Sequence, residues 1–430
     1  MEFRKLTEKE FSDFEVKHEQ SNFNQTIQWG KLKKYNGWDW HLLGLVDNKK
    51  VVAASLVLSK KTPIGKNMFY APHGFLIDYN DYSLLEQFTE KIKEYAKKNN
   101  AIFVKIDPYI IYQERDINGD IVENGKNNKK AYDNLLKLGY KHFGFNVMQE
   151  SLQPRWIFVT DTKGKSVDEV MKKMESKTRQ IIRKNERECI KTREISYDEI
   201  ELFKDIMSHT GDRRGFIDRP LSYYQNMYKE LNPSGILKIL VAELDIKELV
   251  ETYEKEIDEI KKSYEERKYK HDNGINKMNE DKYLSKQKQD EENINRIEKK
   301  LEGAKELKKE HGDKLTLGGI LFLIHGNEVV SLVGGSYDKY MEYQSAYTVH
   351  WAGCKYAIEN GYDRYNFYGI TGDFNPNNSL YGLYLFKRGY GGKVVELIGE
   401  FDLVISSFWY KIYKIAFKIY HSIKNIKHKD

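Results

Sequence analysis

The most regular hydrophobic pattern in the chain lies between residues 243 and 312, in a segment rich in Glu and Lys that contains no Pro. Apolar residues recur there at spacings of three and four, as along one face of a helix. The sequence His271-Asp272-Asn273-Gly274 is a turn signal that divides the segment. The first stripe consists of Ile246, Leu249, Val250, Tyr253, Ile257, Ile260 and Tyr264. We therefore predict an antiparallel helical arm that extends roughly 40 Å.

On both sides of the arm, the pattern predicts mixed α and β structure. Apolar, β-rich runs flank Asp47-Asn48 and again flank His325-Gly326-Asn327-Glu328, so each pair of runs predicts a β-hairpin. In each half, a helical pattern then leads into a further apolar strand. The predicted strands are 40–46, 51–58, 101–107, 317–324, 329–334 and 364–368, and the predicted helices are 83–98 and 347–360.

A weak internal repeat relates the two halves of the chain. The helix–strand junction at 94–107 resembles the one at 355–365, and residues 135–140 resemble residues 385–390. Chance similarity of short junctions is the alternative, but two related units are the simplest account. We therefore predict an α/β (α+β) chain with two tandem units. The predicted boundaries are 1–148 for the first unit, 149–242 with 313–402 for the second, 243–312 for the arm and 403–430 for a basic, aromatic C-terminal helix.

Composition and missing motifs exclude several classes of protein. The two cysteines, Cys189 and Cys354, lie outside any CxxC and predict neither a disulfide framework nor a zinc site. The N-terminus has no apolar signal segment and no run is apolar enough to span a bilayer, which predicts a cytoplasmic protein. GxxxxGK[ST], GxGxxG, HExxH, GxSxG and an acyl-CoA pyrophosphate loop are all absent. We therefore expect no metal and no cofactor, and a substrate that arrives already activated.

Two basic segments suggest anionic partners. Residues 172–193 hold nine basic and three acidic residues, the best candidate for contact with an RNA backbone, with a solvated basic helix as the alternative. The arm has 17 Lys and Arg against 18 Asp and Glu over 246–311, so it reads equally as a spacer or as an RNA contact. The tail from Phe408 mixes aromatics with lysines, as helices at the inner membrane face do. A helix docked on the protein explains that tail equally well.

Three motifs, in this order and with the arm between the first and second, resemble the Fem family (FemABX) of non-ribosomal peptidyltransferases. They are Lys105-Ile106-Asp107-Pro108, Asp363-Arg364-Tyr365-Asn366-Phe367-Tyr368-Gly369 and Tyr384-Leu385-Phe386-Lys387-Arg388-Gly389-Tyr390. The resemblance extends over essentially the whole chain. It implies two acetyltransferase-like (GNAT-like) domains with an inserted coiled-coil arm. It also implies transfer of an amino acid from aminoacyl-tRNA to an amine of the stem peptide, or growing bridge, of a peptidoglycan precursor, which is lipid II or UDP-MurNAc-pentapeptide.

The resemblance assigns catalytic roles to two residues. Lys387 matches the family lysine implicated in stabilising the tetrahedral intermediate, where a fixed cation can contribute about 3–4 kcal/mol. A surface lysine on a helix is the alternative. Asp107 ends a strand beside Pro108 and could accept a proton from the attacking amine or orient it. Because an unshifted carboxylate is a poor base, we favour orientation or a structural role for Asp107.

Further residues are assigned to the two substrates. Arg219 and Tyr223 resemble the family's contacts to the precursor's diphosphate, and Arg has a planar fork suited to phosphate oxygens. Lys33 resembles the second phosphate-binding cation, although Lys31 is close enough to be confused with it. The predicted tRNA contacts are Arg179, Arg183, Lys184 and Arg187. The rival hypothesis is a catalytically silent RNA- or membrane-binding protein with the same fold.

Overall fold

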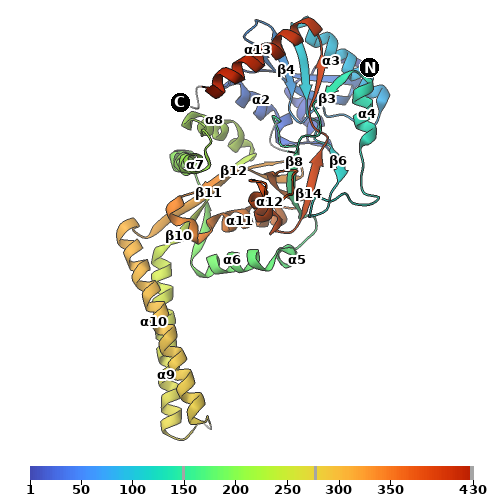
Figure 1. Ribbon diagram of the computed structural model, residues 1–430. Coiled ribbons are helices and arrows are strands. Elements are labelled where there is room, and N and C mark those ends of the chain that lie inside the picture. Colours follow the sequence, from blue (N-terminus) through green and yellow to red (C-terminus); the bar gives the residue numbers. More distant parts are fainter. Residues whose placement is uncertain (148–150, 276–277, 427–430) are drawn as a thin grey trace.

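The computed structural model describes residues 1–147, 151–275 and 278–426, with the side chains of the last helix described as far as Phe417. Two twisted sheets with helices packed on them form the body, and a helical arm projects from it (Figure 1). The predicted α/β class is therefore confirmed. The predicted boundary at 148/149 and the chain end at 427–430 lie outside the described residues.

The first sheet has helices on both faces. Neighbouring residues of one strand point to opposite sides, so Leu43 packs with Phe88 of one helix layer while Leu42 packs with Phe11 of the other. The strand order is β1 (Glu2–Lys5), β2 (Asp39–Asp47), β3 (Lys50–Lys61), β4 (Asn67–Ala71), β5 (Ala101–Ile106), β15 (Phe401–Val404) and β7 (Tyr140–His142). The helices are α1 (Glu8–Glu15) and α2 (Ile27–Lys34) on one face and α3 (Tyr82–Lys98) and α4 (Lys129–Lys137) on the other.

The second sheet is also covered on both faces. Its strand order is β6 (Ile111–Glu114), β14 (Lys393–Leu397), β8 (Trp156–Asp161), β13 (Arg364–Gly369), β12 (Glu328–Ser336), β11 (Lys314–His325), β10 (Leu237–Asp245) and β9 (Ile190–Glu194). One face packs against α5 (Val167–Lys173), α6 (Ser176–Arg187), α11 (Ser345–Glu359) and α12 (Tyr381–Arg388), and the other against α7 (Ile200–Arg214) and α8 (Leu221–Leu231). Short 3₁₀ turns lie at Phe23–Gln25, Tyr197–Glu199, Asn232–Ser234 and Asp338–Tyr343.

Two strands cross the predicted boundaries between the units. β6 lies within residues 1–148 but pairs with β14 in the second sheet. β15 spans the predicted end of the second unit at residue 402 but lies between β5 and β7 in the first sheet. Strand periodicity reports which residues face a core, not which sheet a strand joins, so the sequence pattern did not reveal this exchange.

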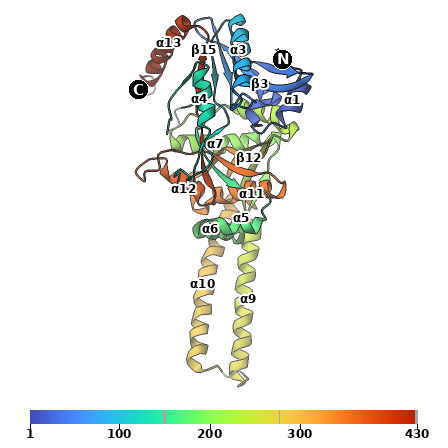
Figure 2. The same cartoon turned by 90° about the vertical axis from the view of Figure 1, so that its right-hand side faces the viewer.

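The arm consists of two long antiparallel helices, α9 (Ile246–Asp272) and α10 (Glu280–His311), and Figure 2 shows it standing clear of the body. Near the body, Tyr253 and Ile257 of α9 are buried with Ile297 and Ala304 of α10. Lys305 forms an ion pair with Glu254 at 2.8 Å across the two helices. The predicted hydrophobic stripe is therefore the seam between the helices, and it is buried where the arm meets the second unit.

The C-terminal helix α13 (Ser407–Ile426) docks on the first sheet. Its buried Tyr410 donates a hydrogen bond to Asp402 Oδ2 at 2.8 Å, and the rings of Tyr410 and Tyr413 lie against Phe103 of β5. Phe408 and Ile415 face outward with 66% and 60% of their surface exposed. Docking and an outward apolar stripe therefore coexist in one helix. Within the described residues, no helix is long and apolar enough to cross a membrane.

Local sequence patterns predicted most individual elements correctly. Both predicted hairpins exist, as β2–β3 and β11–β12. The predicted helices at 83–98 and 347–360 correspond to α3 and α11, and each leads into a strand, β5 or β13.

Truncation separates the roles of β15 and α13. We expect a chain ending at residue 405 to fold, with a free energy of unfolding lower by about 2–4 kcal/mol, because it loses buried Tyr410 and half-buried Tyr413, and full burial of such a side chain contributes roughly 1.5–3 kcal/mol. A chain ending at Gly399 lacks the interior strand β15 and should not fold. Urea unfolding followed by circular dichroism measures both. Cooperative unfolding of the shorter chain would show that β15 is dispensable.

Candidate functional site

Two adjoining cavities lie where the two units meet. Both are open to solvent, with about 320 Å³ of unfilled space in one and about 250 Å³ in the other, and His73, Pro154 and Leu397 line both. The larger is also lined by Asp107, Pro108, Gly144, Asn146, Ser151, Gln153, Arg155, Gly399 and Glu400. The smaller is also lined by Asn22, Phe23, Tyr109, Ile157, Glu328, Asn366 and Tyr368. Concave sites between domains with converging polar groups are typical of substrate sites.

Asp107 lies at the wall of the larger cavity, directly after β5. Its carboxyl group accepts hydrogen bonds from the Tyr70 hydroxyl at 2.7 Å and from the His73 backbone N–H at 2.6 Å. Burial raises the pKa of Asp107 to about 8, against the effect of these two hydrogen bonds. An acid with this pKa can exchange a proton near neutral pH. The premise that Asp107 is an unshifted carboxylate is therefore wrong, and a role as proton acceptor is chemically reasonable.

Lys33, which is half-buried, and Arg219, which is exposed, are two cations whose charges interact. The ammonium group of Lys33 lies over the Trp29 ring at 4.2 Å, and the Arg219 guanidinium lies over the Tyr223 ring at 5.5 Å. Burial, and next the charge of Arg219, lowers the pKa of Lys33 to about 8. Among the described residues, neither side chain has an acidic partner within ion-pair distance. Two adjacent unpaired cations favour binding of an anion.

Lys31 lies elsewhere on α2. Its Nζ forms an ion pair with Glu8 Oε2 at 3.2 Å, on α1 of the same unit. By contrast, α2 brings Trp29 and Leu32 against the second unit, where they pack in one core with Tyr224 of α8. Lys33 is therefore the lysine of α2 that meets Arg219, a distinction that the sequence spacing left open.

Lys387 is buried behind β13. Its Nζ donates hydrogen bonds to the carbonyl oxygens of Phe367 and Gly369, both at 2.6 Å. Burial lowers the pKa of Lys387 to about 7. Lys387 is not among the residues that line the two cavities described above. Its predicted contact with a reaction intermediate therefore requires its ammonium group to leave these carbonyls, and the role stays a prediction.

Tyr368 and Gln153 are site residues that the sequence did not single out individually. The Tyr368 hydroxyl donates a hydrogen bond to Gln153 Oε1 at 2.6 Å. Tyr368 lines the smaller cavity and Gln153 the larger, so the contact lies at the division between them. Tyr368 lies within the motif from Asp363 to Gly369, but only its backbone, with φ of 63°, distinguishes it from the tyrosines nearby. A sequence does not display that dihedral.

A buried acid fixes the floor of the smaller cavity. Glu328 accepts hydrogen bonds from the Tyr109 hydroxyl at 2.8 Å, Arg364 Nε at 2.8 Å and Asn366 Nδ2 at 3.1 Å. Tyr109 comes from the segment that connects the two sheets, whereas the other three belong to the second sheet. The network therefore holds that segment against the second unit.

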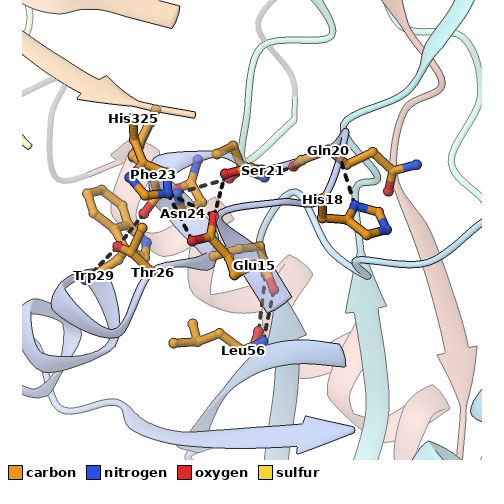
Figure 3. Close-up of polar contacts among 12 residues, drawn as sticks. Glu15, His18, Gln20, Ser21, Phe23, Asn24, Thr26, Trp29, Leu56 and His325 are labelled. Atoms are coloured by element: carbon orange, nitrogen blue, oxygen red, sulfur yellow. Dashed lines mark hydrogen bonds and ion pairs between the residues drawn. The ribbon is translucent and has the colours of Figure 1, made fainter. Parts of the chain in front are cut away.

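The segment between α1 and α2 is also attached to the second unit. Figure 3 shows buried Glu15 accepting hydrogen bonds from Ser21 Oγ at 2.6 Å and from His325 Nε2 at 2.8 Å. His325 ends β11 in the second sheet, so this contact joins the units. Next to it, Asn24 is fully buried, and neither of its amide atoms has a hydrogen-bond partner within the described residues.

The basic segment lies on α6 near the base of the arm. Arg183, Lys184 and Arg187 are exposed along it. Arg179 differs, because its guanidinium donates to the carbonyls of Lys172 and Met174 where α5 ends. Arg179 is therefore engaged with the protein itself, and the other three predicted tRNA contacts are more accessible. Across the parts of the chain that are described, no group of three His, Cys, Asp or Glu side chains could hold a metal ion.

Comparison with known proteins identifies the family. The FemAB family model matches residues 6–418. An aminoacyltransferase FemA from Staphylococcus epidermidis is 34% identical over 423 residues, which cover 97% of this chain and 100% of the relative. A FemA from Staphylococcus aureus is 31% identical over 435 residues, with 99% of each chain covered. The crystal structure of FemX superposes with a TM-score of 0.82 at 26% identity and covers 96% of this chain and 99% of that one. The chain therefore belongs to the FemAB family.

Proposed function

We propose that this aminoacyltransferase moves an amino acid from aminoacyl-tRNA to an amine of the stem peptide, or growing bridge, of a peptidoglycan precursor. Two observations carry the proposal: Lys33 and Arg219 lie where α2 of the first unit packs on α8 of the second, and the buried carboxyl of Asp107 lines a cavity between the same two units. A precursor has both a diphosphate and an amine. The diphosphate would bind the cations Lys33 and Arg219, and the amine would lie at Asp107. The relatives named aminoacyltransferase support the reaction class.

The proposed reaction is aminolysis of an ester. The neutral amine attacks the carbonyl carbon of the aminoacyl ester, a C–N bond forms and the C–O bond to the tRNA ribose breaks. Asp107 accepts the proton that the amine loses, and the departing ribose oxygen takes up a proton to become a hydroxyl. With a pKa near 8, Asp107 can accept the proton from the amine and then donate it to the ribose oxygen more readily than an ordinary carboxylate can.

The decisive experiment is a transfer assay with the purified full chain. Lipid II or UDP-MurNAc-pentapeptide is incubated with a panel of charged tRNAs, and mass spectrometry detects addition of one aminoacyl residue. A product with at least one charged tRNA supports the proposal and identifies the amino acid. No product with any tRNA or precursor, despite binding of RNA or membranes, would favour the catalytically silent rival.

Loss of Arg219 should weaken precursor binding. We expect Arg219→Ala to raise KM for the precursor about tenfold or more, because a charge-assisted contact contributes roughly 1.5–3 kcal/mol. In the wild type, KM should rise as the pH passes upward through about 8, where Lys33 loses its charge. Steady-state kinetics at varied pH measures both effects.

Lys31→Ala is the matched control, because Lys31 pairs with Glu8 and should leave KM unchanged. A truncated acceptor without the diphosphate should be insensitive to Arg219→Ala. Equal sensitivity of both acceptors to this substitution would disprove the phosphate assignment.

The contact with tRNA is proposed for α6. Replacing Arg183, Lys184 and Arg187 by Gln should weaken binding and flatten its salt dependence, because each neutralised phosphate contributes about −0.9 to the log–log slope on duplex. Replacing residues 246–310 by a short Gly/Ser loop should leave the slope nearly unchanged. Filter binding across a salt series measures both. An arm deletion that abolishes the slope, with no effect of the Gln variant, would assign tRNA binding to the arm.

Peripheral contact with an anionic bilayer is proposed for α13. Phe408, Lys411 and Ile415 lie on its outward side, where apolar and cationic groups can reach lipid. The full chain should co-sediment with anionic vesicles at low salt, and the chain ending at residue 405 should bind less. Each lysine near the surface contributes on the order of 1 kcal/mol, so high salt should release the protein. Equal binding by both chains would mean that α13 serves only to pack on the first sheet.

A further inference from the structure

The backbone of Tyr368 is held in a conformation that tyrosine rarely adopts. Its φ is 63°, in the left-handed region, and the β13–β8 register shifts at this point between Asn366 and Gly369. This conformation is strained for any residue with a Cβ, and it persists only where neighbouring groups impose it. Such strain at a cavity wall invites a functional explanation.

Two neighbours impose the conformation. Lys387 donates to the carbonyls of Phe367 and Gly369, which are the residues on either side of Tyr368. The Tyr368 backbone N–H donates to Asn366 Oδ1 at 2.7 Å. Lys387 thus holds the peptide unit that precedes Tyr368 and the one that follows Gly369, so its two hydrogen bonds bracket Tyr368 on β13.

The side chain of Tyr368 lies at the division between the two cavities. Burial, and next the charge of Asp107, raises the pKa of Tyr368 above its usual value. Its hydroxyl donates to Gln153, which lines the same cavity as Asp107. A ligand that occupies both cavities therefore meets Tyr368 where they adjoin.

We propose that Tyr368 contacts the acceptor and that Lys387 is a positioning residue that acts through it. In the complex, a peptide carbonyl oxygen of the acceptor replaces Gln153 Oε1 as the acceptor of the hydrogen bond from the Tyr368 hydroxyl. Loss of the Tyr368–Gln153 contact joins the two cavities. This inference rests on the proposed function for the identity of the acceptor. It replaces the predicted contact of Lys387 with the intermediate by a positioning role, which agrees with its hydrogen bonds to the carbonyls of Phe367 and Gly369.

The first test removes the hydroxyl alone. Tyr368→Phe should lower kcat/KM for the precursor about tenfold, the effect expected for one hydrogen bond, and leave KM for aminoacyl-tRNA within about twofold. Tyr365→Phe is the matched control in the same strand, because the Tyr365 hydroxyl meets buried His350 and lines neither cavity described here. Unchanged kcat/KM in Tyr368→Phe would overturn the contact with the acceptor.

The second test separates positioning by Lys387 from stabilisation of an oxyanion. Lys387→Met removes every donor, whereas Lys387→Gln removes the charge and keeps two N–H donors for the two carbonyls. Positioning predicts that Met lowers kcat roughly 100-fold and that Gln restores most of it. A direct cationic role predicts that Gln loses as much as Met, because both lack the charge. That outcome would overturn the positioning role.

A third measurement does not depend on turnover. Crystal structures of the Lys387 variants should show Tyr368 displaced from Gln153 in the Met variant and retained in the Gln variant. Tyr368 in place in a Met variant that is inactive would overturn the inference. If the wild type transfers nothing, the proposed function fails, yet these structures still decide whether Lys387 holds Tyr368.

Calorimetric titration of Tyr368→Phe with the precursor then tests whether the Tyr368 hydroxyl contacts the acceptor. An affinity equal to that of the wild type would refute this contact.

Discussion

Pairing of β15 between β5 and β7 is the constraint on which the rest of the site depends. This strand belongs to the first sheet, but the chain reaches it directly from β14 of the second sheet. In the opposite direction, the chain leaves β5 and enters β6 of the second sheet. The two crossing segments, 107–110 and 398–400, supply Asp107, Pro108, Gly399 and Glu400 to the cavity walls. The cavities therefore form where the chain is obliged to pass between sheets, and backbone pairing at both ends fixes their walls.

Burial then determines the chemistry of the charged groups near this crossing. Lys105 forms ion pairs with Glu400 at 3.0 Å and with Asp402 at 3.1 Å, so these two acids largely neutralise its charge. Asp107 has two hydrogen-bond donors but no cation within ion-pair distance among the described residues, and burial raises its pKa. Lys33 shows the opposite imbalance, with a cation beside it and no acid. Hydrogen bonds and packing thus fix the junction, whereas Asp107 and Lys33 have no partner of opposite charge among the described residues. This is expected of a site that binds a charged ligand.

The sequence predicted what depends on neighbours along the chain. Hairpins, the arm and the helix–strand junctions follow from hydrophobic periodicity and turn residues, and the structure contains them. The exchange of β6 and β15 could not be predicted, because strand periodicity is the same in either sheet. Nor could the sequence choose between Lys31 and Lys33, which differ by two positions on one helix. That choice depends on α8, which is nearly 200 residues away and packs against α2. The conformation of Tyr368 depends on Lys387 in the same way, through a contact between residues far apart in the sequence.

The chain leaves the body for the arm and returns from it at neighbouring strand ends. Asp245 of β10 pairs with Lys314 of β11, so the chain departs and returns at adjacent positions of one sheet. Removing the same number of turns from α9 and α10 would shorten the arm and leave this pair in register. Arm length is therefore a variable that selection can change without moving any wall of the cavities. A change in the length of this arm therefore leaves the geometry at the unit junction unchanged, and the arm can evolve as a separate module.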